Sequence, residues 1–411
     1  MIEQLHIAFR NADKIDPNSI DDYLAAGGYE ALAKARWLDP KALTDEVKRA
    51  NLRGRGGAGF NAGLKWSFVP SGAETVYVAC NLDEGEPGTY KDRLIVQKDP
   101  HSLLEGMAIC GWAVGSTQGY IYCRGEYPYV VDHLNKAIAQ AEARGVLGDF
   151  KIEVRMGAGA YVCGEESALI ESIEGHRGLP RYKPPFPGVN GIWDKPTVVH
   201  NVETLVTLPV IVEKGADWFT AIGASNYPGT KVLTLTGDVV NREAFEVPTN
   251  VTLRQVVFEL GGGVRDGKKL KAVQVGGTSG GLVPESYLDT PVDFDSMRLL
   301  GAFLGLGTGA MLVLDETRDI VDVLTRVTKF FVHESCGKCS PCREGTFRIH
   351  ELMKKINDGE GSDEDIERLE SIGNVMLRAS LCGSGQASPG PVLTGIRYFR
   401  SEFDHKLKAR V

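Results

Sequence analysis

Apolar runs separated by amphipathic segments predict an α/β unit in the first half of the chain. A short apolar run typical of a buried strand occurs at 75–80, and two further strands are predicted at 119–123 and 151–154. Helical patterns lie between them, at 101–115 and 128–144. Strands that alternate with helices in this way favour a mostly parallel sheet with helices on both faces. The residues before the first strand show helical patterns only, so we expect a helical N-terminal segment.

A smaller α+β module is expected in the middle of the chain. The turn-forming triplet Tyr227-Pro228-Gly229 marks its start. We predict short strands at 231–237, 244–247 and 272–276, and one helix at 253–260. The segment 276–281, Gly-Gly-Thr-Ser-Gly-Gly, is interpreted as a structural turn between domains in preference to a ligand-binding loop.

The last quarter of the chain has a helical pattern throughout. The predicted helices are 320–334, 346–358, 363–380 and 391–408. We therefore expect a helical bundle at the C-terminal end. The predicted domain division is 1–226, 227–318 and 319–411.

Composition narrows the class of protein. A hydrophobic content of 43% and a charged content of 24% are ordinary for a soluble globular protein. The net charge of −8 argues against nucleic acid or an anionic membrane surface as the main partner. The sequence has no apolar run long enough for a membrane span, and Met1-Ile2-Glu3-Gln4 lacks the start of a signal peptide. We therefore expect a cytoplasmic protein, peripheral to a membrane only through a larger complex.

The glycine-rich segment 54–60, Gly-Arg-Gly-Gly-Ala-Gly-Phe, is the most informative stretch of the first half. Glycines let the backbone come close to a phosphate, and successive N–H groups can then point at one anion. A helix N-terminus behind the loop would add a favourable dipole. The segment is not the dinucleotide-binding fingerprint, because helical sequence and not a strand precedes it. Taken alone, such a loop is as often a plain turn.

Polar, glycine-rich segments also follow two of the predicted strands. The segment 81–89 comes directly after the first strand, and the segments 157–160 and 163–166 follow the third. Open α/β sheets bind ligands at the carboxyl ends of their strands. We therefore expect these segments and the glycine-rich loop to meet at one crevice.

Eight cysteines fall into two sets. One set is scattered in apolar or mixed surroundings, which is typical of small buried residues in a reducing compartment. These residues are Cys80, Cys110, Cys123 and Cys163.

The second set forms a Cys-x2-Cys-x2-Cys run with a fourth cysteine further on. Its members are Cys336, Cys339, Cys342 and Cys382. Three thiolates in a short loop and a remote fourth suit a [4Fe–4S] cluster, and Lys338 and Arg343 would offset part of its negative charge. A structural zinc site is the alternative, although zinc more often uses two separated Cys-x2-Cys pairs. Four free thiols are the least favoured interpretation.

Taken together and in order, several segments resemble the NADH-binding FMN flavoprotein subunit of respiratory complex I. The same subunit type occurs in soluble NAD-linked hydrogenases, including electron-bifurcating ones, and in formate dehydrogenases. The matching segments are 54–60 with Lys65-Trp66, 81–93, 161–166, 183–187, 201–205 and both cysteine segments. Two departures occur: Asn61-Ala62 stands where the family usually has Pro-Thr, and His200 precedes Asn201 where two asparagines are usual.

The resemblance implies a Rossmann-like FMN/NADH domain, a β-grasp (ubiquitin-like) soluble-ligand-binding domain and a helical bundle that carries the [4Fe–4S] cluster. It also implies which residues contact FMN and its surroundings. The FMN contacts are Gly56, Gly57, Lys65, Asn81, Asp83, Asn201 and Thr204, and the further cofactor-binding residues are Gly54, Arg55, Gly59, Tyr161, Gly164 and Lys183.

For NADH, the resemblance assigns a role to two kinds of side chain. Phe60, Phe68 and Phe186 would stack on the adenine, since aromatic faces suit a purine. Glu84 or Glu86 would accept hydrogen bonds from ribose hydroxyls and repel a 2′-phosphate, which predicts a preference for NADH over NADPH. Glu165 and Glu166 would line the nicotinamide end.

The activity implied is NADH dehydrogenase chemistry. A flavin can accept a hydride from NADH and pass single electrons to an iron–sulfur cluster, so no general acid or base is expected. The remaining cysteines lack cluster spacing, so electrons should leave to iron–sulfur partner subunits of a multisubunit oxidoreductase. Two alternatives remain: an FMN enzyme with a structural zinc that reduces a small acceptor directly, and a non-catalytic scaffold subunit that has lost the flavin.

Overall fold

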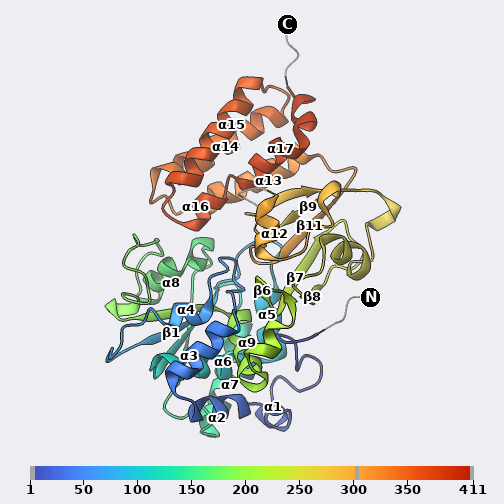
Figure 1. Ribbon diagram of the computed structural model, residues 1–411. Coiled ribbons are helices and arrows are strands. Elements are labelled where there is room, and N and C mark those ends of the chain that lie inside the picture. The colour runs from blue at the N-terminus through green and yellow to red at the C-terminus, as the bar shows by residue number, and fades with distance from the viewer. Residues whose placement is uncertain (1–4, 301–304, 408–411) are drawn as a thin grey trace.

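The protein is described here from a computed structural model that covers residues 5–300 and 305–407 (Figure 1). The predictions that concern Met1 to Gln4 and Lys408 lie outside the described residues. Among the described residues, no helix is both long and apolar enough to cross a membrane.

The first unit is built on a four-stranded sheet in the order β3-β2-β1-β4, and all neighbouring strands are parallel. The strands are β1 (Tyr77–Leu82), β2 (Gln118–Cys123), β3 (Lys151–Met156) and β4 (Thr197–Asn201). The predicted parallel α/β class is confirmed, and β4 is a strand that the sequence analysis did not predict.

Helices cover both faces of this sheet. Val78 and Cys80 of β1 point into the large core made with α6 and α9, whereas Ala79 points to the opposite face, which α8 covers. Alternate residues of a strand face opposite sides, so the central strand β1 is mostly buried on both faces, whereas the edge strand β3 has only one buried residue. The helices of this unit are α1 (Ile20–Ala25), α2 (Glu30–Trp37), α3 (Pro40–Arg49), α4 (Ala62–Trp66), α5 (Lys91–Lys98), α6 (Pro100–Val114), α7 (Pro128–Ala143), α8 (Glu166–Ile173), α9 (Val202–Lys214) and α10 (Ala216–Thr220).

The second unit is a five-stranded mixed sheet in the order β10-β9-β11-β7-β8. Its strands are β7 (Thr230–Gly237), β8 (Ala244–Pro248), β9 (Leu270–Val275), β10 (Gly281–Pro284) and β11 (Ala310–Asp315). The central pair β11 and β7 is parallel, and the other pairs are antiparallel. The helix predicted at 253–260 is present as α11 (Leu253–Gln255) followed by a π-helical turn (Val256–Leu260), and α12 (Phe294–Leu299) precedes β11.

The boundary predicted after residue 226 lies inside a small hairpin, β5 (Gly223–Ala224) and β6 (Tyr227–Pro228). The first two units are also joined far from that point. The backbone N–H groups of Ile7, Ala8 and Phe9 donate to the buried carboxylate of Glu246 on β8, at 2.8, 2.8 and 2.9 Å. The N-terminal segment therefore runs against the second unit.

The C-terminal unit is the predicted helical bundle, at the top of Figure 1. Its helices are α13 (Ile320–Glu334), α14 (Ser340–Asn357), α15 (Asp363–Ala379), α16 (Gly383–Ala387) and α17 (Gly390–Asp404). The prediction for the second helix was wrong at its start, because α14 begins at Ser340 and not near residue 346. Pro341 fits the first turn, where a missing N–H costs no hydrogen bond, so helix formation begins within the cysteine segment.

Candidate functional site

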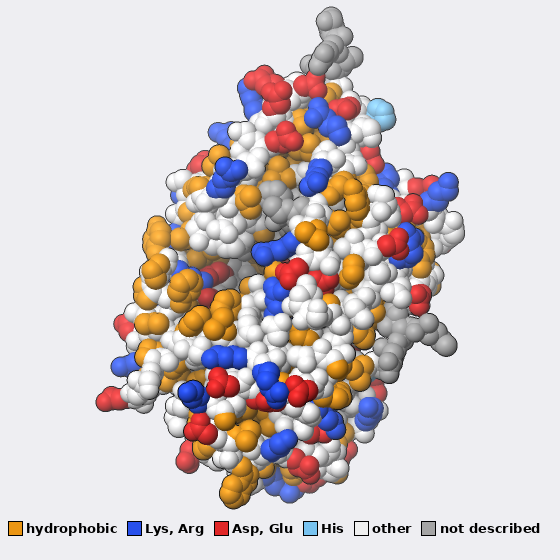
Figure 2. Space-filling model, viewed as in Figure 1, with side chains coloured by type: hydrophobic (Ala, Val, Ile, Leu, Met, Phe, Trp, Pro, Cys, Tyr) orange, Lys and Arg blue, Asp and Glu red, His pale blue; other side chains and the backbone are white. Residues whose placement is uncertain are grey.

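A cavity of about 520 Å³ lies where the three units meet, and every unit contributes to its wall. Figure 2 shows a hollow in the surface beneath the C-terminal helices. The α/β unit lines the cavity with Gly56, Gly57, Ala58, Asn81, Asp83, Glu84, Gly85, Glu86, Thr89, Asp92, Tyr161, Gly164, Glu165 and Asn201. The mixed-sheet unit adds Gly276, Ser279, Gly280, Phe294, Arg298, Gly305, Gly307 and Thr308, and the bundle adds Leu377, Gly383, Ser384, Gln386 and Ala387.

The glycine-rich loop forms one wall of this cavity. Helix α3 ends at Arg49, so the loop follows a helix as predicted. A Cβ atom built on Gly56 would lie 2.8 Å from Asn201 Cβ, and Gly57 has a φ of +127°, which favours glycine. Only a bare backbone therefore fits between the cavity and Asn201.

The carboxyl ends of the parallel strands supply the opposite side. Asn81 at the end of β1 donates its Nδ2 to the carbonyl of Gly164 at 2.8 Å, and its Oδ1 accepts from the N–H of Asp83 at 3.0 Å. Asn201 ends β4 and caps α9 through the N–H of Glu203. These segments meet the glycine-rich loop at one crevice, as the sequence predicts.

A buried ion network lies behind Asn201 and holds its amide. Lys91 Nζ lies 2.6 Å from Asp92 Oδ1, 3.0 Å from Glu203 Oε2 and 3.0 Å from Asn201 Oδ1. Asn201 Nδ2 donates to Asp92 at 2.7 Å, and Lys231 on β7 lies 2.6 Å from Glu203. Two ammonium groups thus face two carboxylates, which gives the charge balance that burial requires. Burial lowers the pKa of Lys231 to about 8, against the opposing effect of Glu203.

Asp83 carries a buried carboxylate oxygen that has no partner within the described residues. Its Oδ2 accepts no hydrogen bond, and Arg124 is 3.9 Å from Oδ1. Burial raises the pKa of Asp83 to about 7. An orphaned acceptor in a cavity wall is suited to a ligand hydroxyl, and the glycine-rich loop opposite leaves room for a backbone-bound phosphate. The unpaired Asp83 oxygen and the glycine-rich loop, whose glycines put no side chains in the way, therefore fit FMN.

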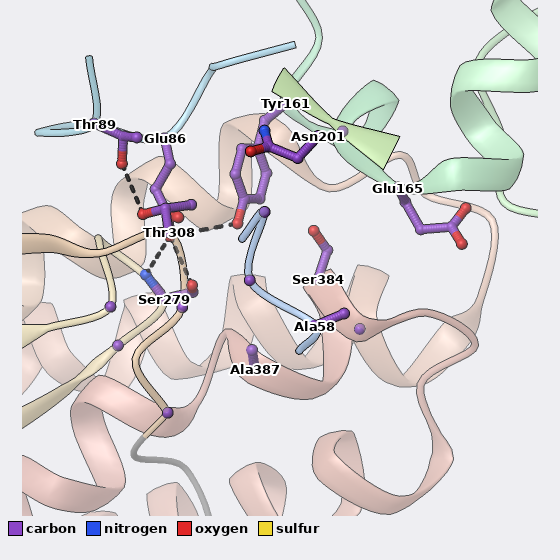
Figure 3. A pocket seen from close by; sticks show the side chains of 18 of the residues that line it. Ala58, Glu86, Thr89, Tyr161, Glu165, Asn201, Ser279, Thr308, Ser384 and Ala387 are labelled. Carbon is purple, nitrogen blue, oxygen red and sulfur yellow. Dashed lines mark hydrogen bonds between the residues drawn. The ribbon is translucent and has the colours of Figure 1, made fainter. Parts of the chain in front are cut away.

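The two glutamates expected at the ribose are already engaged within the protein. Glu84 accepts from the N–H groups of Asp92 and Arg93 at 2.8 and 3.1 Å and so caps α5. Glu86 Oε1 accepts from Ser279 N and Oγ at 2.9 and 2.6 Å (Figure 3). Both glutamates line the cavity, but Glu86 also ties the mixed-sheet unit to the α/β unit.

A chain of ion pairs borders the cavity at the residues predicted for its nicotinamide end. Lys65 Nζ lies 2.6 Å from Glu166, and Lys183 Nζ lies 2.9 Å from Glu166 and 2.8 Å from Glu165. Burial alone would raise the pKa of Glu166, but the two ammonium groups outweigh it and hold the pKa at about 2. Glu165 lines the cavity, whereas Lys65, Glu166 and Lys183 are not among its lining residues.

Four further predicted residues lie outside the cavity lining. The N–H of Arg55 donates to Thr204 Oγ1 at 2.9 Å, and the buried Arg55 guanidinium lies 4.1 Å from the centre of the Tyr227 ring. Gly54 closes the loop by donating to the carbonyl of Phe60 at 2.8 Å, and Gly59 packs against Phe294. These residues support the shape of the loop, and their assignment as ligand contacts stays a prediction.

The three phenylalanines expected at the adenine are not part of the core. Phe60, Phe68 and Phe186 are 46%, 48% and 55% exposed, and the rings of Phe60 and Phe68 are 5.9 Å apart. Gly188 lies against Phe68, which brings the third phenylalanine to the same region. Exposed aromatic groups of this kind mark a binding surface more often than a packing defect.

Sequence analysis missed the contributions of the other two units. The segment 276–281 was interpreted as a structural turn, yet Gly276, Ser279 and Gly280 line the cavity. Thr308, which bonds Thr89 at 2.8 Å, and Ser384 of α16 were not predicted (Figure 3). The glycine pairs Gly276-Gly277 and Gly280-Gly281 were the one local sequence signal for a role of this segment in the site.

The four cysteines of the second set share one site beside this cavity. Cys336 and Cys339 lie in the loop before α14, Cys342 lies in the first turn of α14, and Cys382 directly precedes α16. Burial raises the pKa of the Cys342 thiol to about 11, and the other three thiols add to this rise, so all four are close together. Residues Gly383 to Ala387 line the cavity, so the cysteine site and the cavity share a wall.

The positions of the four sulfur atoms can be compared with what a single zinc ion would need. A tetrahedral zinc with Zn–S bonds of about 2.3 Å places its sulfurs about 3.8 Å apart. In the part of the chain that the structure describes, no three of the four sulfurs lie within 4.8 Å of one another. A [4Fe–4S] cubane binds one thiolate at each of four separate irons, and the four cysteines supply that number.

Comparison with known proteins agrees with this geometry. Residues 47–210 match the family profile described as the Nuo51 FMN-binding domain. Residues 322–406 match the NADH-ubiquinone oxidoreductase-F iron-sulfur binding region.

Individual relatives cover nearly the whole chain. The NADP-reducing hydrogenase subunit HndC of Solidesulfovibrio fructosivorans is 46% identical, over 98% of this chain and 83% of that protein. The F 2 subunit of the NADH-quinone oxidoreductase of Rhizobium meliloti (strain 1021) is 43% identical, over 98% of each. The crystal structure of an NAD+-reducing [NiFe]-hydrogenase in the H2-reduced state superposes with a TM-score of 0.87 at 37% identity, over 100% of this chain and 68% of that one.

The chain therefore belongs to the family of NADH-binding FMN flavoproteins that serve as subunits of complex I and of NAD-linked hydrogenases. It is an oxidoreductase subunit with an FMN-binding domain and a [4Fe–4S] region. The predicted family, fold class and cofactors are confirmed, and the zinc and scaffold alternatives are set aside.

Proposed function

We propose that FMN and NADH bind in the cavity where the three units meet, and that the four cysteines hold the [4Fe–4S] cluster which receives the electrons. The observation that carries this proposal is the shared wall: α16 begins directly after Cys382 and lines the cavity. A cofactor in the cavity and a cluster on the four thiols would then be neighbours without any rearrangement of the chain.

The residues proposed to hold FMN are those that line the cavity on the side of the α/β unit. Gly56 and Gly57 would present backbone N–H groups to the phosphate, and Asp83 and Asn201 would bind polar groups of the cofactor. When bound, FMN supplies the chemistry that links a two-electron donor to a one-electron acceptor. The protein's part is to bind, to orient and to exclude water.

The residues proposed for NADH lie towards the exposed side of the glycine-rich loop. Phe60, Phe68 and Phe186 offer their exposed faces to the adenine. Glu165 and Glu86 lie in the cavity wall, where carboxylates disfavour a 2′-phosphate. A preference for NADH over NADPH therefore stays part of the proposal, although one relative is named as NADP-reducing. A higher kcat/KM for NADPH would overturn it.

The chain is proposed to act as one subunit of a multisubunit oxidoreductase in the cytoplasm. The remaining cysteines are buried in the α/β unit and lack cluster spacing in the sequence, so no second cluster is proposed there. The relatives are named as subunits of hydrogenases and NADH-quinone oxidoreductases. Purification of the tagged chain from its native cells should therefore yield stoichiometric iron–sulfur partners, and recovery of the chain alone under mild conditions would contradict this.

The test of the central proposal is an anaerobic titration of the purified full chain with NADH. Absorption should show loss of the oxidised flavin band, and EPR should show a reduced-cluster signal, at about one flavin and four irons per chain. Cys382→Ser should remove most of the cluster signal while flavin reduction continues. Flavin reduction with zinc and no iron, or absence of flavin from iron-replete protein, would refute the proposal.

A further inference from the structure

The charged lining of the cavity is almost entirely acidic. Asp83, Glu84, Glu86, Asp92 and Glu165 line it, whereas Arg298 on α12 is the one basic residue among its described lining residues. Nucleotides carry phosphate anions, and a carboxyl group cannot pair with a phosphate as a cation does. A ligand phosphate that enters this cavity therefore meets only one lining side chain of opposite charge.

Arg298 is held in place but makes no polar contact with its guanidinium. Its guanidinium carbon lies 4.8 Å from the centre of the Phe294 ring, a cation–π arrangement. Within residues 5–300 and 305–407, the guanidinium has no hydrogen-bond acceptor and no carboxylate partner. Stacking leaves the N–H groups at the edge of the guanidinium plane available, and these groups suit phosphate oxygens bidentately.

The ring that holds Arg298 is itself fixed against the glycine-rich loop. Phe294 is 6% exposed, and a Cβ atom built on Gly59 would lie 3.0 Å from it. Tyr227 stacks on the same ring at 6.3 Å between centroids. Arg298 is therefore positioned next to the loop whose backbone is proposed to bind phosphate.

Arg53 provides a comparison within the same cluster. Its guanidinium lies equally close to Phe294, at 4.8 Å, but is paired with Asp295 at 3.1 Å and donates to the carbonyl of Gly59. Arg53 does not line the cavity. Of the two arginines on this ring, one is used inside the protein and the other faces the cavity with its donors unused.

From this geometry we infer that Arg298 binds a phosphate group of the nucleotide in the cavity and so contributes to coenzyme affinity. The inference rests on the proposed function, because it requires FMN or a dinucleotide at this place. Three phosphates have the required chemistry: the pyrophosphate of the dinucleotide, the 2′-phosphate of NADPH and the 5′-phosphate of FMN.

The experiment compares Arg298→Ala, Arg298→Lys and wild-type full-length protein loaded with FMN and iron–sulfur cluster. Calorimetry measures the Kd of ADP-ribose, and of adenosine as a ligand without phosphate. We expect Arg298→Ala to weaken ADP-ribose about tenfold, equivalent to about 1.4 kcal/mol, with adenosine unchanged. Arg298→Lys should weaken ADP-ribose binding about threefold, because lysine keeps the positive charge but lacks the planar guanidinium that binds two phosphate oxygens at once. The ratio of the ADP-ribose Kd values of Arg298→Ala and wild type should fall at high salt, because the Arg298 side chain is exposed and salt screens its charge.

Two further measurements distinguish the source of the phosphate. A loss confined to NADPH relative to NADH assigns Arg298 to the 2′-phosphate, and a loss confined to FMN retention assigns it to the flavin phosphate. Either result supports the inference. Arg254→Ala is the matched control, because Arg254 is an exposed arginine of the same unit that pairs with Asp289 outside the cavity.

Failure of the inference and failure of the proposed function give different results. If the wild-type chain binds ADP-ribose and FMN and Arg298→Ala binds both with unchanged affinity and salt dependence, Arg298 has no such role. If the wild-type chain binds neither, the proposed function is refuted and the role of Arg298 with it. Thermal unfolding of the variants shows whether any loss comes from misfolding.

Discussion

Substitution of Gly56 by alanine tests the close approach of the glycine-rich loop to Asn201. The added Cβ would lie 2.8 Å from Asn201 Cβ and 3.3 Å from its Cγ. Carbon atoms prefer about 3.5–4.0 Å, so one side must shift by about 0.7 Å or more. Asn201 resists this shift because Lys91, Asp92 and Glu203 all bond its side chain.

The loop must therefore move towards the cavity. Overpacking of a tight site costs about 1–3 kcal/mol. If that cost falls on cofactor binding, the Kd of FMN rises about 5- to 150-fold. The assay is the quenching of FMN fluorescence by apoprotein, with the ratio of flavin to protein after purification as a second measure.

Gly54→Ala is the matched control for this prediction. It adds the same methyl group to the same loop, but its Cβ would lie 3.4 Å from the carbonyl oxygen of Phe60. Neither glycine has a left-handed φ, so backbone strain does not separate the two variants. Equal FMN affinity for Gly56→Ala and wild type, or equal losses in Gly56→Ala and Gly54→Ala, would refute the reasoning.

Three more predictions concern the cluster, a buried acid and the ion network. Cys382→Ser should lower iron from about four per chain while FMN stays bound, and unchanged iron would remove Cys382 from the ligand set. Burial raises the pKa of Asp83 to about 7, whereas the unfolded chain releases this proton near pH 4. The folded state binds the extra proton in that window, so its contribution to the unfolding free energy falls as pH rises from about 4 to 7, and Asp83→Asn should flatten this slope in urea titrations. Glu203→Gln leaves two buried lysines short of a carboxylate and should cost about 3–5 kcal/mol of stability; Glu213→Gln, exposed on the same helix, should change it by less than about 0.5 kcal/mol.

The sequence predicts elements well where one pattern dominates. Strands β1 and β2 are short and largely apolar, β3 alternates polar and apolar residues after an amphipathic helix, and each was predicted. Strand β4 was missed because His200 interrupts its apolar run, yet that ring is buried and neutral. Trp66 Nε1 donates to His200 Nε2 at 2.7 Å, and burial lowers the pKa of His200 to about 3. Helix α9 was missed because it is apolar on nearly every face and contains Pro209, so it has no amphipathic period.

The residues of the site also fall into those that a local sequence pattern predicts and those that it does not. Asn81, Asp83 and Gly164 follow strand ends, so a local rule places them at the crevice. Ser279 and Ser384 come from units that dock onto the crevice, and no local pattern encodes docking. Arg298 was missed for a related reason, because its importance depends on the acidic character of a wall that other segments build.

A few hydrogen bonds between the three units hold the cavity and the cysteine site in fixed relative positions. Glu86 reaches from the α/β unit to Ser279 of the mixed-sheet unit, and Glu334 of the bundle accepts from the N–H of Tyr161 at 3.0 Å. Tyr161 in turn donates to Glu86 at 3.5 Å. Tyr161 thus bonds the bundle directly and reaches the mixed-sheet unit through Glu86. Because hydrogen bonds to carboxylates are stronger than those between neutral groups, these few contacts fix the relative positions of the cavity wall and the end of α13, directly before the cysteine segment. Any change that loosens Tyr161 should therefore disturb electron transfer before it disturbs the fold of any single unit.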